Sequence, residues 1–102
     1  MPKKTKANCL SYNNILIDTE RRIVTVDEST VNLTYKEFEL LYYLIYNKSV
    51  VLTRDQIMNE VWGTDFEGET RTVDVHIRTL RQKLGAAGEC IETVRNVGYK
   101  VN

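Results

Sequence analysis

The stretch from Thr70 to Leu84 combines side chains that can bind the edges of nucleic-acid bases with the spacing of an amphipathic helix. At about 3.6 residues per turn, one face of such a helix collects apolar residues and the opposite face collects polar ones. The apolar face holds Val73, Ile77, Leu80 and Leu84, and the opposite face holds Arg71, Val75, Arg78 and Gln82, with Thr72 and Thr79 beside them. We therefore expect a helix that docks one face on a core and presents the other.

The polar face matches the hydrogen-bonding pattern of a DNA major groove. Arginine can bind guanine O6 and N7, glutamine can bind adenine, and a small apolar side chain can contact a thymine methyl. A helix of about 15 residues is roughly 22 Å long and fits a groove about 12 Å wide. The alternative is an ordinary solvated basic face. Val75, an apolar residue among the charges, favours a contact surface.

The distribution of charge supports a polyanionic partner, although the net charge of the 102 residues is zero. Residues 1–6 carry a formal charge of +3, residues 7–69 carry −6, and residues 70–102 carry +3. A basic C-terminal third on an acidic body produces a local field that attracts a polyanion whatever the net charge. The length corresponds to one domain.

Several other classes of protein do not fit the sequence. No apolar run is long enough for a membrane span, and no apolar segment follows the basic start as in a secretory signal, so we expect a cytoplasmic protein. His76 is the single histidine and has no paired nucleophile nearby in sequence, and no nucleotide-binding glycine pattern occurs. Cys9 and Cys90 are far apart and belong to no CxxC motif, which favours two reduced thiols over the alternative of one disulfide. We therefore expect neither an enzyme nor a metal or cofactor site.

The elements that position the amphipathic helix can also be predicted. Residues 10–33 contain short apolar runs separated by turn residues, which predicts a small antiparallel meander. Thr34 with Glu37 and Thr53 with Gln56 form two capping boxes, each at the start of a helix. The first helix should end near residue 47 and the second at residue 63.

Two further features lie near the ends of these helices. Arg54 falls in the first turn of the second helix, where the helix dipole disfavours a cation, so either a phosphate contact or chance explains it. The loop 62–69 is longer than the turn of a simple helix-turn-helix. After the third helix, two β-rich runs flank residues 95–98, which predicts a hairpin with a glycine-containing turn and with Arg95 and Asn96 at its tip.

The order of these elements and four sequence stretches resemble the effector domain of OmpR/PhoB-type response regulators. The stretches are LTYKEFELL at 33–41, LTRDQIMNEVWG at 52–63, RTVDVHIRTLRQKL at 71–84 and TVRNVGY at 93–99. The resemblance implies an α+β winged helix with a four-stranded antiparallel N-terminal sheet, three helices and a C-terminal β-hairpin wing. It places this domain at residues 10–102, after a linker or disordered segment at residues 1–9.

The resemblance also implies which residues contact DNA. The third helix would enter the major groove with Arg71, Thr72, Val75, His76 and Arg78, the wing Arg95 would enter the minor groove, and Tyr99 would lie near phosphate. Arg54 and Trp62 match positions that touch the DNA backbone. The sequence departs from the family pattern at three positions: Tyr35 replaces a usual proline, Asn96 a usual glycine, and Thr79 an arginine of some members.

Two functional hypotheses follow from the sequence. The first is sequence-specific binding of double-stranded DNA as the output domain of a two-component regulator. For this function the resemblance implies binding at direct repeats, with a receiver domain and a sensor kinase that these residues do not contain. The second is a winged helix that contacts RNA polymerase or another protein through the loop 62–69. Arg71 and Arg78 on one exposed face favour the first hypothesis. The sequence has no heptad pattern, so we expect the isolated chain to be a monomer.

Overall fold

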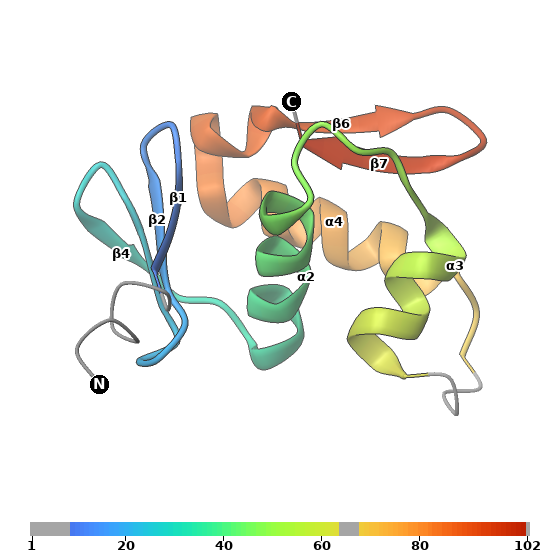
Figure 1. Cartoon of the computed structure of the whole chain (residues 1–102), viewed down its shortest axis with the longest axis horizontal. Coiled ribbons are helices and arrows are strands. Elements are labelled where there is room, and N and C mark those ends of the chain that lie inside the picture. Colours follow the sequence, from blue (N-terminus) through green and yellow to red (C-terminus); the bar gives the residue numbers. More distant parts are fainter. Residues whose placement is uncertain (1–8, 64–67, 102) are drawn as a thin grey trace.

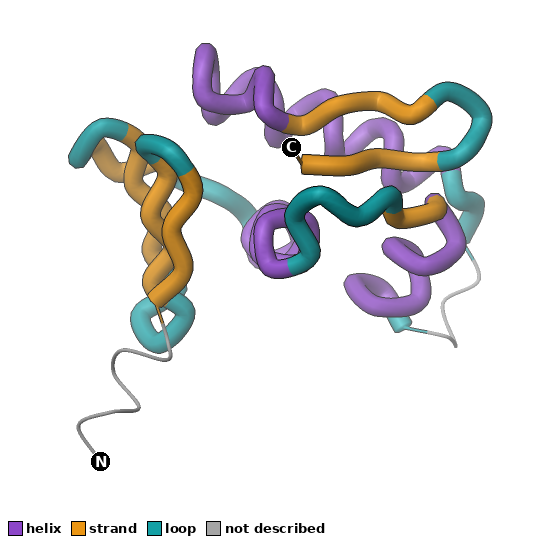
Figure 2. Tube along the Cα trace, turned by 45° about the horizontal axis from the view of Figure 1, so that its top comes forward, coloured by secondary structure: helices purple, strands orange, loops and turns teal. Residues whose placement is uncertain are grey.

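The computed structural model describes residues 9–63 and 68–101. Two antiparallel sheets lie on either side of a central helix, and two further helices complete the domain (Figure 1). The tube view shows the same arrangement, with the N-terminal sheet well separated from the C-terminal hairpin (Figure 2). No helix among the described residues is both long and apolar enough to cross a membrane.

The N-terminal sheet is a meander of four strands in sequence order, as predicted. The strands are β1 (Cys9–Tyr12), β2 (Ile15–Asp18), β3 (Ile23–Val26) and β4 (Ser29–Val31). Positive φ angles at Asp27 and Glu28 form the tight two-residue turn between β3 and β4. The alternate residues Ile15, Ile17 and Val24 are buried on the inner face. β1 begins at Cys9, one residue before the domain boundary that the sequence predicted.

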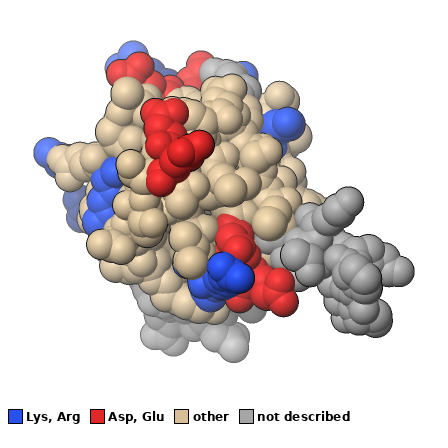
Figure 3. Space-filling view, turned by 90° about the vertical axis from the view of Figure 1, so that its left-hand side faces the viewer, with Lys and Arg blue, Asp and Glu red and all other residues tan. Residues whose placement is uncertain are grey.

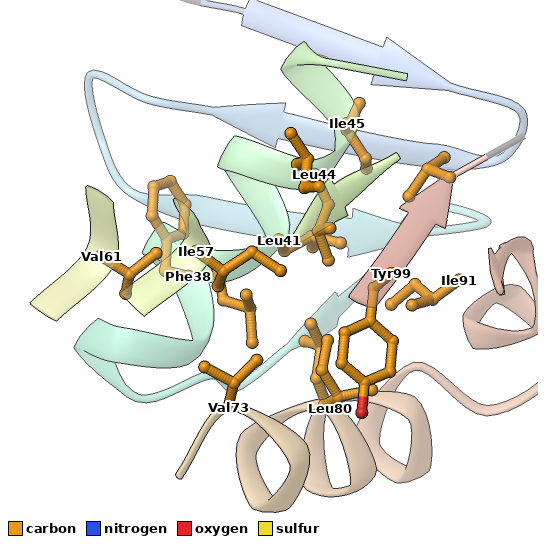
Figure 4. Close-up of a cluster of buried hydrophobic side chains, with 14 of the residues drawn as sticks. Phe38, Leu41, Leu44, Ile45, Ile57, Val61, Val73, Leu80, Ile91 and Tyr99 are labelled. Atoms are coloured by element: carbon orange, nitrogen blue, oxygen red, sulfur yellow. The ribbon is translucent and has the colours of Figure 1, made fainter. Parts of the chain in front are cut away.

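Helix α2 (Tyr35–Tyr46) crosses the centre of the domain and begins at the predicted capping box. The Thr34 hydroxyl accepts a hydrogen bond from the Glu37 backbone N–H at 3.2 Å, and the Glu37 carboxylate accepts one from the Thr34 N–H at 2.9 Å. The helix ends at Asn47, as expected. Its residues Phe38, Leu41, Leu44 and Ile45 are buried in the core (Figure 4).

The second helical segment begins at the other capping box but does not remain an α-helix. Thr53 and Gln56 cap helix α3 (Arg54–Ile57), which continues as the π-helix η1 (Met58–Trp62) and ends at Gly63. A two-residue strand that the sequence did not reveal, β5 (Leu52–Thr53), precedes α3. It ties the start of this helix to the C-terminal hairpin.

Helix α4 (Arg71–Leu84) has the predicted extent, and a short 3-10 helix that was not predicted, η2 (Gly85–Cys90), follows it. The chain closes with the hairpin β6 (Ile91–Val94) and β7 (Gly98–Val101). The pairing order β5-β7-β6 makes this hairpin part of a three-stranded sheet.

The glycine of the hairpin has a different role from the predicted one. Asn96 supplies the positive φ of the turn, at 64°. Gly98 instead lies in β7 directly opposite Thr53, where an added Cβ would meet the Leu52 carbonyl oxygen at 1.9 Å. Glycine is therefore needed for the close approach of β5 and β7 and not for the turn.

Candidate nucleic-acid interface

Helix α4 separates an apolar face from a polar one, as its sequence predicts. Val73, Ile77, Leu80 and Leu84 are at most 4% exposed, and Val75 on the opposite face is 60% exposed. Arg71, Arg78 and Gln82 are exposed beside Val75. Arg71 lies 3.8 Å from the Glu69 carboxylate, and because both side chains are largely in solvent, this ion pair holds the guanidinium only weakly.

The polar residues at one edge of this face are already hydrogen-bonded to the helix backbone. The Thr79 hydroxyl donates to the Val75 carbonyl oxygen at 3.0 Å. His76 Nδ1 lies 2.9 Å from the Thr72 carbonyl oxygen, so Nδ1 carries the proton of this bond. Thr72, His76 and Thr79 are half-buried. The side chains of His76 and Thr79 therefore each use one donor within the helix.

Trp62 lies against this edge of α4 and not in the centre of the core. Its ring meets the His76 ring edge-on at a centroid distance of 4.8 Å, and the Lys36 ammonium lies 5.9 Å from the Trp62 ring centroid. Trp62 is half-buried and packs against the core. It therefore supports the start of the loop 62–69, of which residues 64–67 lie outside the described part of the structure.

The hairpin presents the two residues that were predicted at its tip. Arg95 and Asn96 are exposed between β6 and β7, and Val97 beside them is 42% exposed. Asn96 has the positive φ that its replacement of glycine requires, and asparagine tolerates this conformation better than most residues. The tip therefore carries a guanidinium beside an apolar side chain.

Two predicted DNA contacts have a different environment in the structure. Tyr99 is only 5% exposed, and its ring extends from β7 to α4 (Figure 4). Its hydroxyl donates to Asp74 Oδ1 at 2.5 Å, and Arg54 Nε donates to the same oxygen at 2.8 Å. The Asp74 carboxylate therefore partners the cation in the first turn of α3, and a phosphate contact of Arg54 stays a prediction. The position of Tyr99 near a DNA phosphate stays a prediction, and in the structure its hydroxyl is hydrogen-bonded to Asp74.

Asp74 and Arg81 are the positions that the sequence reasoning missed. Arg81 donates to the Ile91 carbonyl oxygen from Nε at 3.2 Å and from Nη2 at 2.7 Å, and to Thr93 Oγ1 at 2.8 Å. Both residues lie on the same edge of α4, because seven residues correspond to about two turns. That spacing was visible in the sequence, but it did not reveal the hairpin as the partner.

The surface of the N-terminal sheet differs from this interface. In the view toward that side of the domain, small groups of acidic and basic side chains, some of them adjacent, lie on a largely uncharged surface (Figure 3). The part of this face that is visible carries no continuous basic patch. The exposed Arg21 and Arg22 of the meander each lie beside a carboxylate. Arg71, Arg78 and Arg95 are exposed on α4 and in the turn of the hairpin.

Two carboxylates that support the interface have lowered pKa values. Burial raises the pKa of Glu37, but hydrogen bonds from Lys83 and from the Thr34 backbone outweigh this effect. Burial likewise raises the pKa of Asp74, but hydrogen bonds from Tyr99 and Arg54 outweigh it. The Lys83 ammonium lies 2.7 Å from Glu37, so this pair joins α4 to α2.

These lowered pKa values predict a loss of stability in acid. A carboxylate with a lower pKa in the folded state contributes stability above its unfolded pKa of about 4, and this contribution disappears as the pH falls through the folded pKa. The free energy of unfolding, measured in urea from pH 7 to pH 3, should therefore fall below about pH 4. Glu37→Gln should flatten this fall, whereas Glu28→Gln at an exposed turn should not. Equal curves for both variants would contradict the assignment.

The geometry and the comparisons define the class and the family of this chain. A four-stranded antiparallel sheet, three helices and a C-terminal hairpin beside an exposed helix face constitute a winged-helix domain. Residues 27–101 match the family model described as "Transcriptional regulatory protein, C terminal". The chain belongs to this family, the C-terminal effector domains of OmpR/PhoB-type response regulators.

Several similar proteins support this assignment. The chain is 46% identical over 101 residues to response regulator ArlR of Staphylococcus saprophyticus, covering 97% of this chain and 46% of that protein. It is 43% identical over 97 residues to heme response regulator HssR of Staphylococcus epidermidis, covering 93% and 43%. The chain thus spans less than half the length of these curated relatives.

Solved structures of similar length agree in fold. The DNA-binding domain of Klebsiella pneumoniae RstA in complex with the RstA box has a TM-score of 0.81 and 32% identity, with 91% of this chain and 95% of that chain covered. The DNA-binding domain of response regulator AdeR in complex with an intercistronic region has a TM-score of 0.81 and 34% identity, with 90% and 97% covered.

Proposed function

We propose that this domain binds double-stranded DNA in a sequence-specific manner, as the output domain of a cytoplasmic response regulator that controls transcription. Helix α4 would lie in the major groove and the tip of the β6–β7 hairpin at the adjacent minor groove. The observation that carries the proposal is the exposed face of α4, where Val75 is 60% exposed beside Arg71 and Arg78. The DNA complexes of RstA and AdeR, which share this fold, support it.

The domain would act as a binding module and not as a catalyst. Its partners in a longer protein would be a receiver domain and a sensor kinase, a proposal that the names of the similar response regulators support. The direct test is selection of bound sequences from a random duplex library, followed by a salt titration on the selected duplex. Specific binding should yield one recurrent sequence, and the affinity should fall steeply with salt. Random recovered sequences would refute sequence-specific binding.

Arg78→Ala should weaken binding to the selected duplex by about 1–3 kcal/mol and relax the preference at one base pair, if this guanidinium contacts a guanine. The fold should be unchanged, because Arg78 is exposed on the side of α4 opposite the core. Arg21→Ala is the matched control, because its side chain is 78% exposed on the N-terminal meander. Equal affinity of Arg78→Ala and the parent would exclude this contact.

Arg95→Ala should weaken binding most on duplexes with A·T-rich sequence beside the core site. A·T tracts narrow the minor groove and strengthen its negative potential, which favours an inserted guanidinium. The measurement compares the loss of affinity on A·T-rich and G·C-rich flanks around the same core site. An identical loss on both flanks would show that Arg95 contacts phosphate and does not enter the minor groove.

A further inference from the structure

One edge of α4 attaches both strands of the hairpin to this helix. Asp74 accepts the hydroxyl hydrogen bond of Tyr99 in β7, and Arg81 donates to Ile91 and Thr93 in β6. The Arg81 guanidinium carbon also lies 5.8 Å from the Tyr99 ring centroid. Two side chains about two helical turns apart therefore fix the hairpin at two points along α4.

The Asp74 carboxylate joins three elements at a single oxygen. Arg54 Nε, at the start of α3, and the Tyr99 hydroxyl both donate to Asp74 Oδ1, at 2.8 and 2.5 Å. The side chains of Arg54 and Asp74 are 29% and 40% exposed, so solvent only partly screens the pair. The same Arg54 donates its backbone N–H to the Val97 carbonyl oxygen of the hairpin turn at 3.3 Å. Asp74 thus connects the start of α3, helix α4 and the hairpin.

An aspartate in this position disfavours binding of a polyanion, so its presence suggests a structural contribution that offsets the repulsion. Asp74 lies in the first turn of α4, next to the exposed face that carries Arg71 and Val75. A carboxylate close to phosphates weakens binding by repulsion. The base of the hairpin is held by the pairing with β5 and by Ile91, Tyr99 and Val101 in the core. Asp74 and Arg81 add the side-chain hydrogen bonds that join the hairpin to α4.

We propose that Asp74 is a positioning residue, which fixes the tip of the hairpin relative to the exposed face of α4. This inference rests on the proposed function and adds to it: Asp74 acts through Tyr99 on Arg95, without contacting DNA itself. A fixed hairpin presents Arg95 and Arg78 in one arrangement, so that binding does not have to order the hairpin first. Without this attachment, Arg95 contributes less to affinity.

A double-mutant cycle tests this inference. Arg95→Ala is introduced into the parent, into Tyr99→Phe and into Asp74→Ala, and the dissociation constants for the selected A·T-flanked duplex are compared at one salt concentration. In each background, the ratio of the dissociation constants with and without Arg95→Ala (the Arg95→Ala factor) measures the contribution of Arg95. This ratio should be at least about threefold smaller in Tyr99→Phe and in Asp74→Ala than in the parent, because the effects of coupled residues are not additive. Asp74→Asn, which keeps an acceptor oxygen, should retain most of the parental factor.

The variants are chosen to separate positioning from charge and from folding. Tyr99→Phe keeps the ring in the core and changes no charge, so it preserves the test if Asp74→Ala fails to fold. Asp55→Ala removes an equal charge from an exposed position in the first turn of α3 and should leave the Arg95→Ala factor unchanged. Hydrogen exchange at the amides of β6 and β7 gives a readout without DNA, and Tyr99→Phe should accelerate it.

Two results would overturn the inference while leaving the proposed function intact. The first is an Arg95→Ala factor that is the same in all backgrounds. The second is tighter binding by Asp74→Ala with an unchanged Arg95→Ala factor, which would mean that Asp74 only neutralises Arg54. If the parent selects no duplex at all, the proposed function fails and the inference fails with it, whatever the hydrogen exchange shows.

Discussion

Gly98→Ala should lower the free energy of unfolding by about 3 kcal/mol or more, beyond the usual range for one added methyl group. The added Cβ would lie 1.9 Å from the Leu52 carbonyl oxygen and 2.9 Å from the Thr53 Cα. Both are backbone atoms of β5, so no side-chain rotation can relieve the clash. The strand β5 would have to move away from β7, and it would carry the start of α3 with it.

Urea unfolding followed by circular dichroism measures this loss. Val97→Ala is the matched control, because its side chain is 42% exposed in the turn next to Gly98, and such a surface change alters stability by less than about 0.5 kcal/mol. DNA binding by any folded Gly98→Ala protein should also be weaker, since Arg54 and the hairpin would no longer share their present geometry. A Gly98→Ala protein as stable as Val97→Ala would show that β5 and β7 can separate at little cost.

Local sequence signals predicted the framework of this domain because their physical causes are local. The two capping boxes each depend on side chains three residues apart, and both form as predicted. The apolar stripe of α4 predicted its buried face because a helix repeats every 3.6 residues. The tip of the hairpin, with Asn96 at positive φ, likewise followed from residues close together in sequence.

The features that the sequence did not reveal depend on contacts between distant segments. The two-residue strand β5 exists only because β7, more than 40 residues later, pairs with it. The change from α3 to the π-helix η1 has no signal in its residues that we could identify. The sequence predicts Gly98 in the turn because glycine is common there, whereas the close approach of β5 explains this glycine.

In the candidate site, too, the features that depend on local sequence were predicted and those that depend on distant contacts were not. The exposure of Arg71, Val75, Arg78 and Gln82 follows from helical periodicity, and the structure confirms it. The surroundings of Arg54 and Tyr99 do not follow from periodicity, because Asp74, their common partner, is 20 and 25 residues away in sequence. Their contacts with DNA stay predictions, and the structure adds their shared attachment to Asp74.

Joining two copies of this domain by a flexible linker should raise the apparent affinity for DNA with two direct repeats by about 10²–10⁴ over the single copy. The second binding event becomes intramolecular, so no new protein contact is needed. Repeats that place two recognition helices on the same side of the duplex lie about 10–10.5 base pairs, or 34–36 Å, apart. The domain measures 39 × 30 × 24 Å along its principal axes. Neighbouring copies therefore fit the repeat spacing if the 39 Å axis is not parallel to the axis of the duplex.

The design of the linker follows from this spacing. A glycine- and serine-rich linker of about 40 residues has an r.m.s. end-to-end distance of about 35 Å, which matches one helical turn of DNA. Single and linked copies are compared at equal salt on duplexes with one and with two repeats, and the single copy should sediment as a monomer without DNA. On one repeat the linked protein should gain no more than about twofold, because only one of its two domains can bind specifically. If the single copy already forms a tight dimer in solution, or if linking gains nothing on two repeats, then the two domains do not bind this DNA independently of each other. Contacts between the copies would then supply the affinity instead.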